Sequence, residues 1–290
     1  MRQKLKIALQ MDPLEKLDLK GDSTFILGFE AIKRGFELYF YSPSDLIYKN
    51  NNVYAKAKIL DLAFKNGKET YNYGNIKVLK LSSLDVILMR QDPPFNMSYI
   101  TATHILEKIA SQTLILNNPF HVRNAPEKIF VTEFSKFMPE TLITRETNEI
   151  IKFKNKNKNI IIKPLYGNGG EGVFYIKDND SNFNVIIENF LNSNEEQFII
   201  QSYIPEVKNG DKRIILVDGE PLGFINRIPK KGDFRSNLAL GGNAEKTSLS
   251  IQEKNICSEL SKHLKDEGLF FVGIDVINGM LSEINVTSPT

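Results

Sequence analysis

The sequence predicts an α/β fold whose N-terminal part is a doubly wound lobe built on a parallel sheet. Short apolar runs alternate with segments of helical spacing along this part of the chain, and such alternation is typical of parallel sheets. The chain has 290 residues, of which 41% are hydrophobic and 25% charged. This composition allows a sizeable core and excludes collagen-like, mucin-like and fully disordered proteins.

The elements of this lobe follow one another in a regular order. Residues 5–11 form an apolar run that indicates a buried strand, and residues 23–35 have helical spacing, with Ser23 as the expected N-cap and a glycine as the stop. The run FELYFYS is the next strand. Residues 84–90 indicate another strand, and a helix is predicted over 100–110 before the strand TLILNN.

Charge and cysteine content narrow the function classes. The 37 basic and 35 acidic residues give a formal net charge of +2. This net charge is too small to indicate a protein that binds nucleic acids or membrane surfaces. Cys257 is the single cysteine, and the N-terminus has too short an apolar run for a signal peptide. We therefore expect a soluble cytoplasmic protein. The lysine- and asparagine-rich segments 49–52 and 154–159 are expected to be solvated loops.

The remaining chain predicts two smaller lobes. After Asn118-Pro119, three strand patterns surround a glycine-rich loop and a short helix, which indicates an α+β unit. The next region contains a hairpin with Asp218-Gly219 at its turn, a loop over 229–243, a helix over 251–267 and two closing strands.

The glycine-rich loop is the first feature with chemical content. Gly167, Gly169 and Gly172 have the spacing G-x-G-x-x-G, but the loop opens into a strand and not into a helix, which argues against a dinucleotide-binding fingerprint. A glycine turn between two antiparallel strands can lie over the phosphates of a nucleotide, because no side chain keeps its amides away. The alternative is a plain flexible hairpin tip.

Two lysines favour the phosphate interpretation. Lys163 ends the apolar strand before the loop, where a cation needs an anionic partner to be partly buried. Lys128 begins a probable helix. Each alone could be a lysine that reaches out to solvent, but with the loop they indicate phosphate recognition.

Acidic side chains in the last two strands indicate a metal site. Asp275 lies in an apolar strand, while Glu283 and Asn285 alternate and share a face. Oxygen ligands of this kind suit Mg²⁺, which takes one or two carboxylates together with substrate phosphates. The alternative is a pair of edge-strand carboxylates facing water. A two-residue turn at Asn278-Gly279 would place Glu283 opposite Ile274, so we predict a longer, bulged turn that sets Glu283 opposite Asp275.

Several runs together resemble the bacterial glutathione synthetases, members of the ATP-grasp ligases. They are MRQDPPF, EKIF, KPLYGNGGEGVF, DKRIILVDGEP, RIPKKGDFRSNLALGG, FVGIDVI and LSEINVTSP. The resemblance implies an N-terminal α/β domain (1–122) followed by a two-lobed ATP-grasp domain, with a central lobe (123–204) and a C-terminal lobe (205–290). It also implies ligation of γ-glutamylcysteine to glycine with ATP as co-substrate, Mg²⁺ or Mn²⁺ as cofactor, and a homotetramer.

The resemblance also implies roles for individual residues. ATP-phosphate contacts are implied for Lys128, Lys163 and the loop that contains Gly167, Gly169, Gly170 and Gly172. Contacts with the base and sugar are implied for Gln201, Tyr203, Ile204 and Asp211. Arg213 and Arg227, with Lys163, are the implied catalytic cations. Asp275, Glu283 and Asn285 are the implied metal ligands. Substrate contacts are implied for Arg235, Thr287, Ser288 and Arg90, although Arg90 could equally pair with Asp92.

Three further expectations follow from the resemblance. The loop over 229–243 matches a mobile lid, so we expect it to be mobile without ligand. In the glycine loop, Asn168 stands where the family has methionine or a small residue. At the other end, relatives are expected to continue for about another helix beyond Thr290. The alternatives are an ATP-grasp ligase with another carboxylate and amine, a non-catalytic ATP-binding module of the same fold, and a plain α/β interaction protein.

Overall fold

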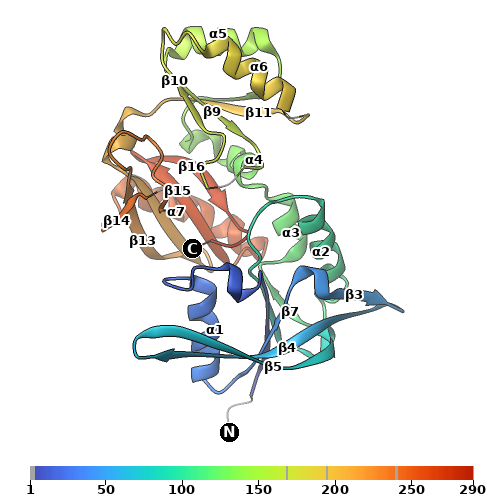
Figure 1. Ribbon diagram of the computed structural model, residues 1–290. Coiled ribbons are helices and arrows are strands. Elements are labelled where there is room, and N and C mark those ends of the chain that lie inside the picture. Colours follow the sequence, from blue (N-terminus) through green and yellow to red (C-terminus); the bar gives the residue numbers. More distant parts are fainter. Residues whose placement is uncertain (1–3, 168, 194, 239–240, 290) are drawn as a thin grey trace.

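The computed structural model describes residues 4–167, 169–193, 195–238 and 241–289, which form three sheets with helices packed against them (Figure 1). The sheets lie within residues 6–116, 141–202 and 211–285, and they confirm the predicted α/β class. The domain boundaries at 122 and 204 stay predictions. None of the helices in the described ranges is long and apolar enough to span a membrane.

The N-terminal sheet has seven strands in the order β3-β4-β2-β1-β6-β7, with β5 paired to β4. Their bounds are β1 (Lys6–Gln10), β2 (Glu37–Tyr41), β3 (Leu46–Lys49), β4 (Asn52–Lys65), β5 (Lys68–Lys80), β6 (Val86–Met89) and β7 (Leu114–Leu116). β2, β1, β6 and β7 are parallel, as predicted, whereas β3, β4 and β5 pair antiparallel. The sheet is therefore mixed and not wholly parallel.

The long hairpin of β4 and β5 was missed by the sequence analysis. Lys65 pairs with Lys68, so Asn66 and Gly67 form a two-residue turn, and both have positive φ (52° and 74°). Asn-Gly between two strand patterns is a strong hairpin signal, and it could have revealed this element. The hairpin is drawn in blue-green at the base of Figure 1.

The helices of this lobe are α1 (Ser23–Lys33), α2 (Met97–Glu107) and α3 (Pro119–Asn124). The N-cap of α1 is Asp22 and not Ser23, because the Asp22 carboxylate accepts from the Phe25 amide at 2.7 Å. Ser23 is instead the first helical residue. The helix ends before Gly35, which has a φ of +82°, as the sequence predicts.

The middle sheet is antiparallel with the order β10-β9-β11-β8. Its strands are β8 (Thr141–Thr144), β9 (Ile160–Pro164), β10 (Phe174–Ile176) and β11 (Phe198–Ser202), and the helices before and around it are α4 (Glu127–Phe130), α5 (Thr147–Asn157) and α6 (Phe183–Ser193). Residues 154–157, expected in a loop, form the last turn of α5. Lys154 is buried there because its ammonium donates to the Asp178 carbonyl at 2.7 Å.

The C-terminal sheet is antiparallel with the order β14-β13-β12-β15-β16. Its strands are β12 (Asp211–Val217), β13 (Glu220–Ile228), β14 (Asn243–Lys246), β15 (Phe271–Ile277) and β16 (Met280–Asn285), and α7 (Ile251–Asp266) packs on it. The predicted turn at Asp218-Gly219 is confirmed, since both residues have positive φ. Among the described residues, short 3-10 helices connect these elements at η1 (Leu14–Lys16), η2 (Pro43–Asp45), η3 (Leu81–Ser83), η4 (Val131–Phe137) and η5 (Pro205–Asn209).

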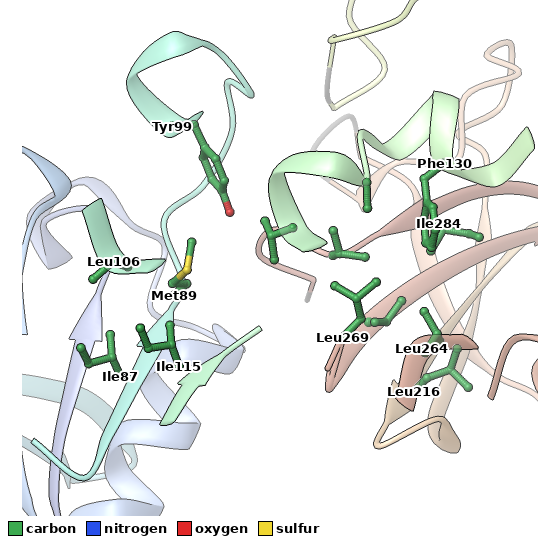
Figure 2. Close-up of a cluster of buried hydrophobic side chains, with 14 of the residues drawn as sticks. Ile87, Met89, Tyr99, Leu106, Ile115, Phe130, Leu216, Leu264, Leu269 and Ile284 are labelled. Carbon is green, nitrogen blue, oxygen red and sulfur yellow. The ribbon is translucent and has the colours of Figure 1, made fainter. Parts of the chain in front are cut away.

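The largest apolar cluster extends through the N-terminal and C-terminal sheets (Figure 2). Met89 and Ile115 belong to the first sheet, and Leu216 and Ile284 belong to the second. Separate clusters fill the other face of the N-terminal sheet and the middle lobe. Cys257 lies in the largest cluster, and burial raises the pKa of its thiol to about 11. The cysteine is therefore a core residue, as predicted.

Candidate active site

A cleft of about 1080 Å³, including its open mouth, lies between the middle and C-terminal sheets. Most of the residues singled out in the sequence line it. These are Lys128, Lys163, Gly167, Gly169, Gly170, Gln201, Tyr203, Ile204, Asp211, Arg213, Arg227, Arg235, Asp275, Glu283 and Asn285. Lys163 and the acidic strands, which come from different sheets, therefore share one cavity.

The two lysines extend into this cleft. Lys163, at the end of β9, places its ammonium 3.5 Å from a Glu283 carboxylate oxygen and 3.4 Å from the Ser282 hydroxyl. Lys128, in α4, donates to the carbonyl of Gly167 in the glycine loop. Both side chains are nearly buried, so neither reaches out to open solvent. Two cations at the mouth of a glycine loop suit the phosphates of a nucleotide.

The glycine loop joins β9 to β10, which pair antiparallel as predicted. A Cβ on Gly167 would lie 2.9 Å from the Pro164 ring, and Gly169 and Gly170 have positive φ. Both features require glycine. Gly172 also has positive φ (67°) but lies outside the cleft lining. Asn168 is outside the described residues.

The hairpin of β15 and β16 places its two carboxylates as predicted, but by a different turn. Ile277 pairs with Met280, so Asn278-Gly279 is a two-residue turn, and the prediction of a longer turn was wrong. A bulge follows instead, between the pairs Val276–Leu281 and Asp275–Glu283, with Ser282 as the extra residue. The bulge restores the register that sets Glu283 opposite Asp275.

Asp275 is the centre of a chain of alternating charges. Arg213 binds both of its carboxylate oxygens, at 2.6 and 3.1 Å, and Arg227 lies 2.9 Å from one of them. Arg227 also donates to Asp211 at 2.5 Å. Burial raises the pKa of Asp211 to about 7, with a further contribution from Asp275. Burial alone would lower the pKa of Arg227, but Asp275 and Asp211 outweigh it and hold that pKa above its usual value.

Glu127 is a cleft residue that the sequence analysis missed. Burial, then the charge of Glu283 and a hydrogen bond to it, raise the pKa of Glu127 well above its usual value. Burial would also raise the pKa of Glu283, but Lys128 and Lys163 outweigh it and hold that pKa well below the usual range. The two shifts have opposite directions, so Glu127 is the carboxyl group of this pair that protonates more readily. Its position beside Lys128 in the run EKIF was the available signal.

The side-chain oxygen atoms of Asp275, Glu283 and Asn285, which line the cleft, are suitable ligands for a divalent cation. Asp275 and Glu283 are cross-strand partners on one face, and neither faces open water. The Asn285 side-chain oxygen accepts from the amide and hydroxyl of Thr287 at 3.2 and 3.1 Å. Within the described ranges, no cluster of three or more carboxylate, histidine or cysteine side chains could hold a metal ion. Two carboxylates and an amide oxygen match Mg²⁺, which takes its other ligands from phosphates and water.

The end of β11, the residues that follow it and the loop after β13 all line the cleft. Gln201, Tyr203 and Ile204 line one wall, and the Tyr203 amide donates to the Asn159 carbonyl at 3.0 Å. Arg235, in the loop after β13, also lines the cleft and forms an ion pair with Asp233 at 2.9 Å. Residues 239–240 of this loop are outside the described residues, and its expected mobility stays a prediction.

Three predicted substrate residues lie elsewhere. Arg90 donates to Thr24 and Ser23 at 3.0 and 2.9 Å and to the Pro289 carbonyl at 2.8 Å. Burial lowers the pKa of Arg90 to about 10, although Asp22 and Asp92 act in the opposite direction. Arg90 and Thr287 line a second, smaller and mainly apolar cavity, and Ser288 donates to the Arg90 carbonyl at 3.3 Å. Their substrate contacts stay predictions.

The fold and the cleft define the class of the protein. A solved structure of D-cycloserine synthetase superposes with a TM-score of 0.66, at 14% identity, over 98% of this chain and 92% of the other. A structure described as an ATP-grasp ligase superposes with a TM-score of 0.60, at 15% identity, over 98% of this chain and 91% of the other. The protein has the fold of the ATP-grasp ligases.

Sequence comparison identifies the family within this class. Residues 5–123 match the N-terminal domain of prokaryotic glutathione synthetase, and residues 127–290 match its ATP-grasp domain. The glutathione synthetase of Mesorhizobium japonicum is 48% identical over 99% of this chain and 91% of its own length. That of Agrobacterium fabrum is 48% identical over 98% and 89%. The chain belongs to the prokaryotic glutathione synthetase family.

Proposed function

We propose that the cleft joins γ-glutamylcysteine to glycine at the expense of ATP, yielding glutathione, ADP and phosphate. One observation carries this proposal. Lys163 of the middle sheet and the Asp275 and Glu283 carboxylates of the C-terminal sheet meet in a single cavity. A triphosphate and its cation need such a meeting of opposite charges.

The chemistry explains why the cleft is rich in cations. A carboxylate does not accept an amine at neutral pH, so ATP first converts the cysteinyl carboxylate into an acyl phosphate. The glycine amine then adds to that carbonyl, and phosphate leaves. Positioning and charge neutralisation dominate the first step. In this proposal Lys128 and Lys163 bind the phosphates, while Arg213 and Arg227 neutralise charge on the transferred group.

The divalent cation would be held by Asp275, Glu283 and Asn285. When bound, Mg²⁺, or Mn²⁺ in its place, would neutralise phosphate charge and help to orient the phosphates. Arg213 and Arg227 bind Asp275, and these ion pairs fix the orientation of that carboxylate in the cleft. The reaction requires no protein nucleophile, and none of its steps involves the buried Cys257.

Contacts with the rest of the nucleotide and with the peptide belong to the same proposal. The base lies against Gln201, Tyr203 and Ile204, with Asp211 near the sugar. The γ-glutamylcysteine end lies toward Arg90, Thr287 and Ser288, with Arg235 on the loop side. The proposal places the enzyme in the cytoplasm, where ATP and thiol substrates occur together. It also includes assembly into a homotetramer.

An ADP-release assay tests this function. ADP should form only when γ-glutamylcysteine and glycine are both present. Turnover that requires a different amine or carboxylate would assign another ligase activity to the same fold. If the protein binds nucleotide but turns over no pair of carboxylate and amine, it is a nucleotide-binding module, and the proposal is contradicted.

A further inference from the structure

β5 lies at the edge of the N-terminal sheet, at the base of the molecule in Figure 1. It pairs with β4 along its whole length, and no other strand of the described residues pairs with its outer side. The sheet therefore leaves a row of backbone donors and acceptors unpaired along a strand of 13 residues. Such an edge is a template for pairing with another strand.

One face of this edge strand exposes apolar side chains. Ile76 and Val78 have 66% and 63% of their surface exposed. They lie opposite Lys58 and Lys56 of β4, so no apolar neighbour on β4 covers them. Strands that avoid partners are commonly short or carry charges at such positions. Exposed β-branched side chains on a long edge strand instead favour contact with another surface.

A bulge in the middle of β5 keeps this face continuous along the strand. The pairs Leu60–Tyr73 and Lys58–Ile76 flank the bulge, and β5 has one residue more than β4 between them. Because side chains alternate along a strand, the extra residue puts odd-numbered residues before the bulge on the same face as even-numbered residues after it. The side chains on this face are those of Glu69, Tyr71, Tyr73, Ile76, Val78 and Lys80.

Two copies of this face are complementary about a two-fold axis through the bulge. If β5 runs antiparallel to β5 of a second copy, with the axis between Gly74 and Asn75, residues equally far from the axis lie opposite each other. An acid then faces a lysine, and each aromatic ring faces a β-branched side chain. Pairs of both kinds stabilise antiparallel strands. The facing pairs are Glu69 with Lys80, Tyr71 with Val78 and Tyr73 with Ile76.

We propose that β5 binds a second copy of this chain, and that antiparallel β5–β5 pairing centred on the bulge joins the two N-terminal sheets. Glu69 and Lys80 lie at opposite ends of β5, so this pairing brings each within reach of the other residue of the second copy. A shift of the register by two residues would set Glu69 opposite Val78 or beyond the end of the strand. The charges therefore favour the register with the axis at the bulge.

The contact uses the same surface on both copies, so it closes after two chains. It goes beyond the proposed function because it does not depend on ligase activity. It would give the proposed homotetramer one of its contacts, and a dimer would contain it equally.

Charge reversal with rescue tests the pairing. Sedimentation velocity measures the dissociation constant of the association between chains. Glu69→Lys and Lys80→Glu should each raise this constant about tenfold or more, because both symmetric pairs change from attraction to repulsion. The double variant, Glu69→Lys with Lys80→Glu, restores opposite charges and should return the constant to within about threefold of the parent value.

Glu188→Lys is the matched control, because it makes the same change of charge at an exposed position of α6 in the middle lobe. It should leave the dissociation constant unchanged, and far-UV circular dichroism shows whether each variant folds. A monomeric parent chain would overturn the proposal, and lysines such as Lys77 would then protect a free edge. Association that neither reversal weakens would also overturn it, and so would a double variant that does not recover.

Disulfide cross-linking provides a second measurement of the register. On the other face of β5, the exposed Asn72 would lie opposite the exposed Lys77 of the second copy. The native Cys257 is buried, so it does not compete. Co-expressed Asn72→Cys and Lys77→Cys chains should form a disulfide-linked dimer on oxidation, and either chain alone should form much less. Equal yields from the co-expressed and the single chains would contradict the proposed register.

Discussion

At the scale of single residues, the cleft keeps its cations in place by pairing them with its own carboxylates. Arg213 and Arg227 both bind Asp275, and Arg227 also binds Asp211. Each charge is nearly buried, so an unpaired member would be costly. The same pairs orient the guanidinium groups toward the space that the proposed function assigns to phosphates. The same ion pairs therefore stabilise the fold and position the two guanidinium groups.

Arg227 is the most direct test at this scale. Arg227→Ala should lower kcat by at least about 100-fold, because a group that neutralises developing charge acts mainly in the transition state. Steady-state kinetics measure the effect, and Arg34→Ala, which removes an exposed arginine paired with Glu30, is the matched control. A change confined to KM would assign Arg227 to ground-state binding only.

Asp211 should make stability depend on pH in a defined direction. Its pKa is about 7 in the folded chain, well above the ordinary aspartate value of about 3.8. Between these values the folded chain binds more protons than the unfolded one, so this group's contribution falls as pH rises through that window. Asp211→Asn removes the titration. Urea unfolding without metal should show a smaller loss of stability from about pH 4 to about pH 7 in this variant. Parallel pH profiles would disprove the assignment.

At the scale of elements, the sequence predicted most of what local signals determine. The β12–β13 hairpin at Asp218-Gly219 and the pairing of Asp275 with Glu283 were predicted correctly. The position of the bulge was not predicted correctly. A turn extended by one residue and a two-residue turn followed by a bulge at Ser282 both set Glu283 opposite Asp275, so the predicted pairing does not distinguish them. Glu127 was missed because its role depends on its contact with Glu283, which is distant in sequence.

The cap of α1 provides a prediction about an element. Asp22→Ala should lower the free energy of unfolding by about 1 kcal/mol, because the Phe25 amide loses its acceptor. Asp22→Asn retains a capping oxygen and should cost much less. Denaturant titration measures both variants. Equal losses would show that the charge of Asp22, and not its cap, stabilises the helix.

At the scale of the whole molecule, Asn117 connects the N-terminal lobe to the strands that carry the acidic groups. Its amide donates to the carbonyls of Phe271 and Val286, and its oxygen accepts from the Phe271 amide, all at 2.8 Å. Phe271 begins β15 and Val286 follows β16. One buried side chain thus joins the N-terminal sheet to both strands of the carboxylate hairpin.

Replacing this amide should weaken the connection between the lobes. Asn117→Asp keeps the size of the side chain but removes two donors and leaves buried carbonyls unsatisfied. We expect it to lower the free energy of unfolding by about 2 kcal/mol or more, as measured by denaturant unfolding. Asn124→Asp, which removes one exposed bond to Phe120, is the control. A loss no larger than that of the control would show that the lobes are held by apolar packing alone.

A crystal structure with AMPPNP and Mn²⁺ would test the central claim most directly. We expect an anomalous Mn²⁺ peak beside Asp275 and Glu283, with phosphate oxygens in contact with Lys128 and Lys163 under the glycine loop. A nucleotide bound in the smaller cavity near Arg90 and Phe271, with no Mn²⁺ at the paired carboxylates, would contradict it.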